Sequence, residues 1–339
     1  MLLSSIILEE HGTGGLLSKE LLDNVIIPNL SPVYLGKMED SGIAPFTGDR
    51  IALTTDSFVV DPIFFGNGDI GKLSICGTIN DLAVSGAVPK YLTLALILEE
   101  GLPIEDLIKI LGSICKTCQE ANIQILAGDT KVVRKGEADK IYINTAGIGY
   151  FPSERQALTL SNIKEFDDII VTGLIGNHGI HILSFREGLG FEHKVLSDCA
   201  PLNLVIEDIL NEFGTKIHYM RDITRGGVGC IFNEIASEIS LSIHMDEKSI
   251  PKQHETIMAA EMLGIDPLYL ANEGSICIFC DPSISEKLVA TLTKYSYTKH
   301  AQVCGTVKNT GDVNVCLNSM DGEIKVIGYL QGKQIPRLC

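Results

Sequence analysis

The sequence predicts an α/β protein, in which layers of helices and strands form two successive domains. Three observations indicate this class. The chain has 339 residues, more than most single domains. Hydrophobic residues make up 45% and charged residues 21%, as in an ordinary globular protein. Strand and helix patterns alternate in two series, with a break near Phe151-Pro152.

The first series precedes that break. A short strand is expected at 50–55, and a helix bounded by glycine follows at about 68–85. The spacing of apolar residues then predicts a strand at 91–98, a helix at 104–121, and further strands at 123–127 and 140–150.

The second series begins with a strand at 168–172. Helices are predicted near 181–187, 202–211, 227–238 and 284–294, and strands near Ile217, Ile243, Ile276 and Val303. This mixed order of hairpins and crossovers favours ferredoxin-like α/β layers in both halves over a single parallel barrel. We therefore expect an N-terminal domain at 1–152, a C-terminal domain at 153–327 and a flexible tail at 328–339.

Composition excludes several classes of partner. The formal net charge of -16 argues against nucleic acid, whose binders concentrate Lys and Arg on one face. The apolar start at 1–8 has no basic residue and soon meets Glu9 and Glu10, so we expect no signal peptide. No run is long enough to span a membrane. Ten cysteines without an export signal predict reduced thiols in the cytoplasm.

Two Cys-x-x-Cys pairs have different geometries. Cys115 and Cys118 fall in the predicted helix at 104–121, on one face. Cys277 and Cys280 fall in a predicted strand, which sends their side chains to opposite faces, so this pair cannot chelate one metal. Buried small side chains are one interpretation of these cysteines, and a zinc site is the other.

The last residue, Cys339, ends the sequence Pro336-Arg337-Leu338-Cys339. A terminal cysteine has no downstream chain to hold it in a core, and chain ends are usually mobile unless something binds them. Such a thiol is suited to carry a chemical group. A frayed end that happens to finish in cysteine is the alternative.

Four aspartates recur at the ends of apolar runs: Asp40, Asp56, Asp81 and Asp129. Carboxylates at strand ends can converge on one cleft, and there they repel one another unless divalent cations bridge them. Mg²⁺ commonly joins carboxylates to nucleotide phosphates in this way. For any one aspartate, a turn or a helix cap is the alternative.

Two glycine-rich segments offer backbone N–H groups to an anion. The first is His11-Gly12-Thr13-Gly14-Gly15, which fits neither the Walker A pattern nor the dinucleotide fingerprint. The second is Gly226-Gly227, which opens onto a predicted helix and follows Arg225, a residue placed to reach a phosphate. A loop and a simple helix start are the respective alternatives.

These segments resemble the AIR synthetase (PurM-like) superfamily of ATP-dependent enzymes. The motifs that carry the resemblance are Thr55-Asp56-Ser57, Asn80-Asp81-Leu82-Ala83, Gly128-Asp129-Thr130 and Asp222-Ile223-Thr224-Arg225-Gly226-Gly227. Within the superfamily the chain is most similar to the HypE hydrogenase maturation factors, in the glycine-rich start, in Ala271-Asn272-Glu273-Gly274 and in the terminal Pro-Arg-Leu-Cys.

The resemblance implies a function and its cofactors. HypE factors receive a carbamoyl group on the terminal cysteine and dehydrate it with ATP to a thiocyanate, which supplies the cyanide ligand of the [NiFe]-hydrogenase iron. The chain is then expected to use ATP and Mg²⁺ and to form a homodimer with the ATP site near the subunit interface. A HypF-type carbamoyltransferase and an iron-carrying HypC-HypD complex are the expected partners.

The resemblance also implies site residues. Cys339 is the carrier, and Glu273 and Lys131 are candidates for removing a proton from the carbamoyl nitrogen. A lysine beside a triphosphate stays protonated, so Glu273 is the better base. His178 is a further candidate, either for contact with phosphate or for capping a helix. Arg337 is a candidate for steering the tail toward the nucleotide. The expected cofactor-binding residues are His11, Gly12, Gly14, Gly15, Asp40, Asp56, Asn80, Asp81, Asp129, Thr130, Arg225, Gly226 and Gly227, and the four aspartates are the expected metal ligands.

Two other functions compete with this hypothesis. Another enzyme of the superfamily is the first, but a selenophosphate synthetase is expected to carry a reactive cysteine near the glycine-rich start, whereas the first cysteine here is Cys76. A thiamine-phosphate kinase needs no terminal thiol. The second is a metallochaperone that holds metal with Cys339 and the Cys-x-x-Cys pairs. Magnesium-dependent ATP turnover distinguishes this class from the enzymes.

Overall fold

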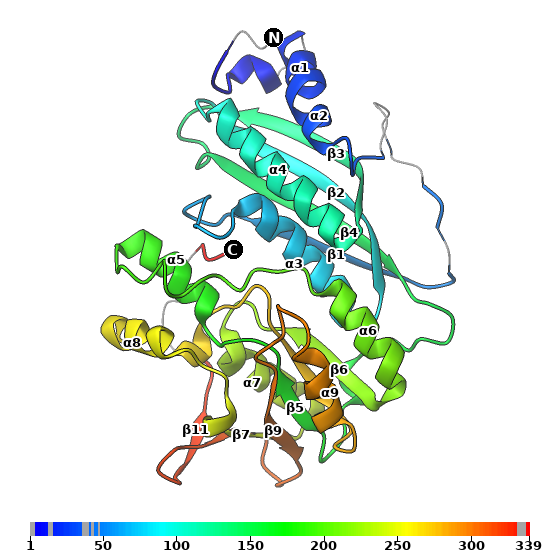
Figure 1. Ribbon diagram of the computed structural model, residues 1–339, viewed down its shortest axis with the longest axis vertical. Coiled ribbons are helices and arrows are strands. Elements are labelled where there is room, and N and C mark those ends of the chain that lie inside the picture. Colours follow the sequence, from blue (N-terminus) through cyan, green and yellow to red (C-terminus); the bar gives the residue numbers. More distant parts are fainter. Residues whose placement is uncertain (1–3, 13–15, 36–40, 42–43, 47, 331–336) are drawn as a thin grey trace.

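The computed structural model describes residues 4–12, 16–35, 41, 44–46, 48–330 and 337–339. It has an upper half around one sheet and a lower half around another (Figure 1), and it confirms the predicted α/β class. The upper sheet has the strand order β1-β4-β2-β3, formed by β1 (Ile51–Phe58), β2 (Val88–Glu99), β3 (Gln124–Val133) and β4 (Ile141–Tyr150).

Helices α3 (Ile70–Val84) and α4 (Ile104–Ala121) cover one face of the upper sheet (Figure 1). In α4 the core residues Leu107, Ile110, Leu111 and Ile114 recur three and four positions apart, and the left-handed Asn122 ends the helix. Nearly every side chain of α3 is buried, because α3 also contacts α6 and β6 of the lower half. The helix that carries Asp81 therefore lies where the two halves meet.

The other face of the upper sheet is open. Strand β1 alternates exposed and partly buried residues, and its apolar Ile51 and Leu53 are 60% and 68% exposed. Ile97 of β2 is also exposed. Asp129 and Lys131 of β3 lie opposite Ala95 and Ile97 in the register, so by strand alternation they belong to this open face.

Three short N-terminal helical segments lie above α4 in Figure 1: α1 (Leu16–Leu21), a π-helical stretch (Leu22–Ile26) and α2 (Ile27–Leu30). A 3-10 turn (Glu9–Gly12) contacts β3. None of them is expected from the sequence pattern. The π-helical stretch and Pro28 interrupt the regular helical period that would have marked a single helix.

The lower sheet has the order β11-β10-β7-β9-β5-β8-β6. Its strands are β5 (Asp168–Val171), β6 (Ile217–Asp222), β7 (Ser242–Asp246), β8 (Ile276–Cys280), β9 (Gln302–Lys308), β10 (Val315–Asn318) and β11 (Ile324–Ile327). Its helices are α5 (Asn177–Glu187), α6 (Asn203–Phe213), α7 (Gly227–Ile239), α8 (His254–Leu263) and α9 (Ser285–Leu292). Helix α8 and the hairpin β10–β11 were not predicted.

Separate hydrophobic clusters pack against the two faces of the lower sheet. Cys277 belongs to one cluster and Cys280 to the other, which confirms that a spacing of three in a strand sends these side chains to opposite faces. Cys115 and Cys118 are buried in the core of the upper half. All ten cysteines are free thiols.

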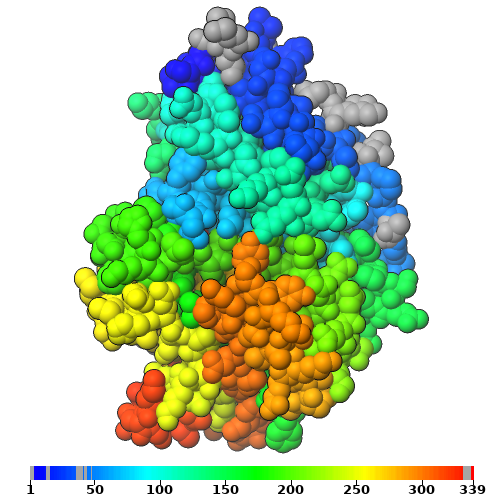
Figure 2. Space-filling view, viewed as in Figure 1, coloured from blue at the N-terminus to red at the C-terminus, as the bar shows by residue number. Residues whose placement is uncertain are grey.

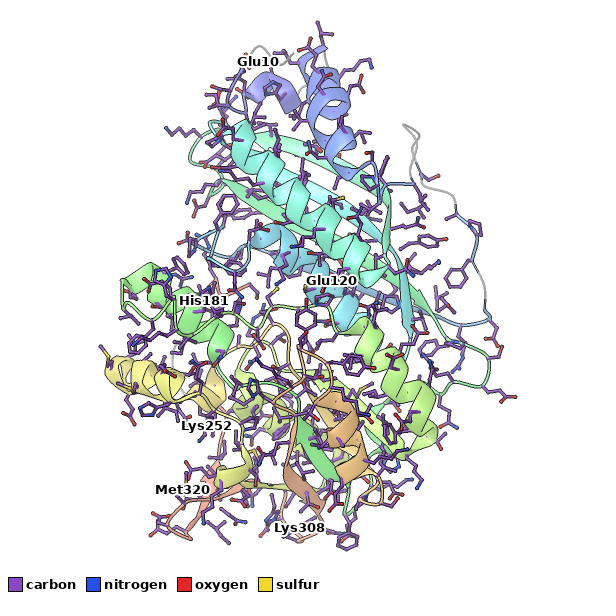
Figure 3. The ribbon with its side chains drawn as sticks, in the orientation of Figure 1. Glu10, Glu120, His181, Lys252, Lys308 and Met320 are labelled. Carbon is purple, nitrogen blue, oxygen red and sulfur yellow. The ribbon has the colours of Figure 1, made fainter. Side chains whose placement is uncertain are left out.

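The halves pack tightly along their junction (Figure 2), where the segment after α9 reaches α4. There the hydroxyl of Tyr297 donates to the carboxylate of Glu120, which Figure 3 labels at the junction. On the opposite side His181 of α5, also labelled, contacts the carbonyl of Phe65 in the upper half. The C-terminus lies close to α5, between the halves (Figure 1).

Candidate active site

A cavity of about 800 Å³ opens between the halves. Strand β1, helix α3, the end of β6, the start of α7, the turn before β8 and the chain terminus all contribute to its walls. The residues that line it and that carry chemistry are Asp56, Asp81, Asp222, Arg225, Glu273 and Cys339. Five of these six were predicted as site residues.

Three aspartates share this cavity. Thr78 donates to Asp56 Oδ2 at 2.8 Å, and Thr54 donates to Asp81 Oδ2 at 3.1 Å. Burial raises the pKa of Asp56 and of Asp222, and burial together with the charges of Asp222 and Asp56 raises the pKa of Asp81 to about 7. Carboxylates that repel one another in this way favour a divalent cation among them.

Glu273 lies on the turn before β8 and is only 4% exposed. Among the described residues its Oε1 has no hydrogen-bond partner. Burial raises the pKa of Glu273 well above its ordinary value, and the neighbouring Cys199, Asp222, Asp198 and Asp81 raise it further. A buried carboxyl group with an unpartnered oxygen can exchange a proton with a substrate placed beside it.

Asp198 holds the turn that carries Glu273. Its Oδ1 accepts from the backbone N of Glu273 at 3.0 Å, and its Oδ2 accepts from Asn272 Nδ2 at 2.8 Å, Gly274 N at 3.2 Å and Ser275 Oγ at 2.7 Å. A Cβ atom at Gly274 would lie 1.8 Å from the carbonyl oxygen of Asp198. Only glycine therefore permits this close approach of two backbones.

The last three residues dock beside the segment that follows β1. Val59 N donates to Cys339 O at 3.1 Å, and Asp61 N donates to Arg337 O at 3.3 Å. His178 Nε2 is 2.7 Å from Leu338 O, and Arg186 Nη2 donates to Arg337 O at 2.7 Å. Main-chain groups of the tail therefore take most of the docking contacts.

Side chains of the tail complete the docking. Arg337 donates from Nε to Val59 O at 2.8 Å and pairs through Nη1 with Asp139 Oδ2 at 2.7 Å. Leu338 and Cys339 pack against the upper core. Burial and the charge of Glu273 together raise the pKa of the Cys339 thiol to about 11, although Arg225, which hydrogen-bonds the thiol, acts in the opposite direction. The thiol thus lies beside both Glu273 and Arg225.

A second cavity, of about 360 Å³, lies under the N-terminal helices. It has apolar walls, and His11, Gly12, Asp129, Thr130 and Lys131 line it as well. Nδ1 of His11 accepts from Leu8 N at 3.0 Å, whereas Nε2 is buried and lacks a partner among the described residues. Burial lowers the pKa of His11, which favours the neutral imidazole.

The expected convergence of the aspartates on one cleft is wrong for Asp129 within one chain. Asp56 pairs with Thr145, Thr145 with Leu94, and Leu94 with Gly128, so two strands separate β1 from β3. Three strand spacings amount to about 14 Å, too far for one cation. Lys131 instead pairs with Asp129 at 2.6 Å, away from the thiol. Asp40, Gly14 and Gly15 lie outside the described residues.

Two further residues have roles different from those expected. Asn80 donates to Ala200 O at 3.0 Å and accepts from Leu202 N at 2.8 Å, so its amide joins the halves and is not free for a nucleotide. His178 binds the tail carbonyl, and no side chain caps α5. The Gly226-Gly227 turn does open onto α7, with Gly227 at φ 58.

Several residues of the site were missed. Asp222 ends β6 in the same pattern as the predicted aspartates, and that pattern could have identified it. Asp198, Ser197, Arg186 and Asp139 lie in segments without a recognisable motif. In the described part of the chain, no three His, Cys, Asp or Glu side chains are placed to hold a metal by themselves. No helix found there is long and apolar enough to cross a bilayer.

Comparisons with known proteins agree with this architecture. Residues 38–151 match the family of AIR synthase related proteins, N-terminal domain, and residues 167–318 match the corresponding C-terminal domain. Carbamoyl dehydratase HypE of Escherichia coli K12 is 37% identical over 97% of this chain and 98% of its own length. The Rhizobium leguminosarum carbamoyl dehydratase HypE is 37% identical over 97% of this chain and 94% of its own.

Solved structures give the same result. A crystal structure of hydrogenase maturation protein HypE in complex with ATP superposes with a TM-score of 0.93, at 38% identity, over 98% of this chain and 99% of the other. The HypE chain of a HypE-HypF complex superposes with a TM-score of 0.79, at 40% identity, over 93% of this chain and 100% of the other. Together these matches confirm the two-domain PurM-like fold class.

Proposed function

We propose how the residues of this chain, which belongs to the HypE family of AIR synthase related proteins, perform the family's reaction. The chain is an ATP-binding carbamoyl dehydratase of hydrogenase maturation. It converts an S-carbamoyl group on Cys339 to S-cyanate, the source of the cyanide ligand of the [NiFe]-hydrogenase iron. The carbamoyl oxygen leaves with phosphate, and the nitrogen loses both of its protons.

One observation carries the assignment of residues: the docked Cys339 thiol shares a cavity with the three aspartates and with Glu273, whose buried Oε1 has no hydrogen-bond partner among the described residues. Bound ATP and Mg²⁺ supply a phosphoryl group that makes the carbamoyl oxygen a leaving group, and a cation that offsets its charge. Asp56 and Asp81 would hold that cation, together with Asp222, which is not among the aspartates expected from the sequence.

Glu273 removes a proton from the carbamoyl nitrogen. Glu273 lines the cavity that holds Cys339 and its charge acts on the thiol, while Lys131 lies at the far edge of the upper sheet. Arg225 contacts the Cys339 thiol and stands at the N-terminus of α7, where an anion is favoured. Arg225 and the Gly226-Gly227 turn are therefore suited to hold phosphate oxygens close to the carbamoyl group.

The second cavity is suited to the nucleoside. Its apolar walls fit a purine base, and the buried Nε2 of His11, which has no partner among the described residues, can donate to a nitrogen of that base. We place Gly12, Asp129, Thr130 and Lys131 at the same subsite, with Lys131 as a phosphate contact. Within one chain the two cavities are separate. One bound ATP can reach both the subsite near Lys131 and a cavity that holds Cys339 only if a second copy of the chain brings them together.

A homodimer supplies such an interface. The open face of the upper sheet exposes Ile51, Leu53 and Ile97, apolar side chains that a second copy can cover. We propose a homodimer through this face, a HypF-type carbamoyltransferase as the donor partner, and a HypC-HypD complex as acceptor of the nitrile. We also propose a cytoplasmic location and a domain division at residue 152.

The intact mass of the C-terminal peptide tests the function. The protein is incubated with a HypF-type enzyme, carbamoyl phosphate and ATP, with Cys339→Ala as control. The wild type is expected to gain one carbamoyl group and to lose one water only with ATP, and Glu273→Gln is expected to stop at the carbamoyl adduct. Dehydration at an undiminished rate in Glu273→Gln would contradict the assignment of the base, and ATP turnover on a free small molecule would favour a sister enzyme.

A further inference from the structure

Residues 197–200 cross between the halves and are fixed to the upper half at both ends. The side chain of Asn67 accepts from Ser197 N at 3.2 Å and donates to Ser197 O at 2.7 Å. Asn80 donates to Ala200 O at 3.0 Å. Ser197 and Cys199 are almost fully buried. The segment is therefore held rigidly and can position the side chains that bind to it.

Ser197 supports one tautomer of His178. The hydroxyl oxygen of Ser197 accepts from Cys199 N at 3.1 Å, so its hydrogen is available to His178 Nδ1 at 2.8 Å. The carbonyl oxygen of Leu338 can only accept, so the ring hydrogen of His178 lies on Nε2, which donates to Leu338 O at 2.7 Å, and Nδ1 accepts from the Ser197 hydroxyl. Burial lowers the pKa of His178, so the imidazole is neutral and the tautomer matters. Ser197 thus stabilises the form of His178 that holds the tail.

Asp198, the next residue, fixes the turn of Glu273. All four of its hydrogen bonds go to residues 272–275, and one goes to the backbone N of Glu273 itself. Adjacent residues therefore support the two groups that must meet: Ser197, through His178, supports the chain end that carries Cys339, and Asp198 supports Glu273.

We propose that Ser197 and Asp198 are the positioning residues of the dehydration, and that they set the carbamoyl group and its base from one rigid segment. Neither residue touches the reacting atoms. The inference rests on the proposed roles of Cys339 and Glu273. The placement of Cys339 relative to Glu273 then depends on Ser197 and Asp198, two residues that belong to none of the sequence motifs. A misplacement of reacting groups by 1 Å can cost about a hundredfold in rate.

The test compares two near-isosteric variants, Ser197→Ala and Asp198→Asn, in the full-length protein. Two rates are measured by mass spectrometry on the C-terminal peptide. One is the alkylation of Cys339 by iodoacetamide in the uncarbamoylated protein, which reports release of the tail. The other is the single-turnover loss of water from the carbamoylated protein with ATP. Ser242→Ala and Asp167→Asn are matched controls, because each alters a buried side chain of the same type away from the cavity.

The two variants are expected to differ. Ser197→Ala should raise the alkylation rate by about fivefold, the equivalent of one hydrogen bond, and lower the dehydration rate. Ser197→Thr, which keeps the hydroxyl, should restore both rates. Asp198→Asn should slow dehydration by about tenfold or more and leave alkylation within about twofold of the wild type, as expected for a support of a reacting group.

Two outcomes overturn the inference: dehydration by both variants at the wild-type rate, or an equal rise of alkylation in both, which would indicate general loosening. These differ from failure of the proposed function, in which the wild-type protein itself keeps its carbamoyl group in the presence of ATP.

Discussion

Replacing Arg337 with alanine should release the tail, by an amount that follows from its contacts. Arg337 makes a charge-assisted hydrogen bond to Val59 O at 2.8 Å and an ion pair with Asp139 at 2.7 Å. The hydrogen bond contributes about 1.5 kcal/mol. The ion pair is partly exposed and contributes about 0.5 kcal/mol. The main chain of Arg337 is left-handed at φ 57, a cost that alanine shares, so the substitution removes only the side-chain contacts.

The sum, about 2 kcal/mol, corresponds to about a thirtyfold larger population of released tail. Alkylation of Cys339 by iodoacetamide at constant pH, followed on the C-terminal peptide, measures that population. Asp139→Asn is the matched variant, because it removes only the ion pair and should raise the rate by about twofold. A rate for Arg337→Ala within twofold of the wild type, or equal to that of Asp139→Asn, would refute this account of docking.

Three further predictions concern the turn that carries Glu273, the Cys339 thiol and the open face of the upper sheet. Gly274→Ala should lower the melting temperature by several degrees and abolish dehydration, because its Cβ would lie 1.8 Å from a backbone oxygen that cannot move aside; an unchanged thermal unfolding curve would contradict this. Docking raises the pKa of Cys339 from 9.0 to about 11. The contribution of the neutral thiol to docking is therefore fully present below pH 9 and is lost as the pH rises toward 11. Tryptic cleavage after Arg337 should accelerate over this range in the wild type but not in Cys339→Ser. Leu53→Lys should convert the proposed dimer to a monomer in sedimentation velocity, whereas the exposed Met320→Lys, remote from that face, should not.

The sequence was most informative where one element has one regular pattern. Helix α4 begins and ends where its apolar spacing predicts, because one side of it packs on a sheet and the other meets water. Strand β3 extends to Val133, six residues beyond its predicted end. Its later residues alternate between the covered face and the polar open face, and the apolar run that marked its beginning stops at Ala127.

The composition of the site was more predictable than its layout. Asp56, Asp81, Arg225 and Glu273 were recognised from motifs, and all four line the cavity that holds Cys339. The separation of Asp129 from them depends on the strand order of the upper sheet, which no single strand pattern encodes. The contacts of His178 and Arg186 with the tail are made to carbonyl oxygens, and a carbonyl leaves no trace in the sequence.

Docking through carbonyl oxygens suits a tail whose terminal sulfur changes its chemistry. The contacts from Val59, Asp61, His178 and Arg186 all bind the main chain of residues 337–339. They are therefore the same whether the sulfur carries a proton, a carbamoyl group or a nitrile. Among the described residues, Glu273, Arg225 and Asp56 act on the sulfur itself. Since the main-chain contacts do not change during the reaction, the difference in docking between substrate and product must arise at those side chains. Release of the finished nitrile therefore requires either a loss of contacts there or a partner that competes for the carbonyls of the tail.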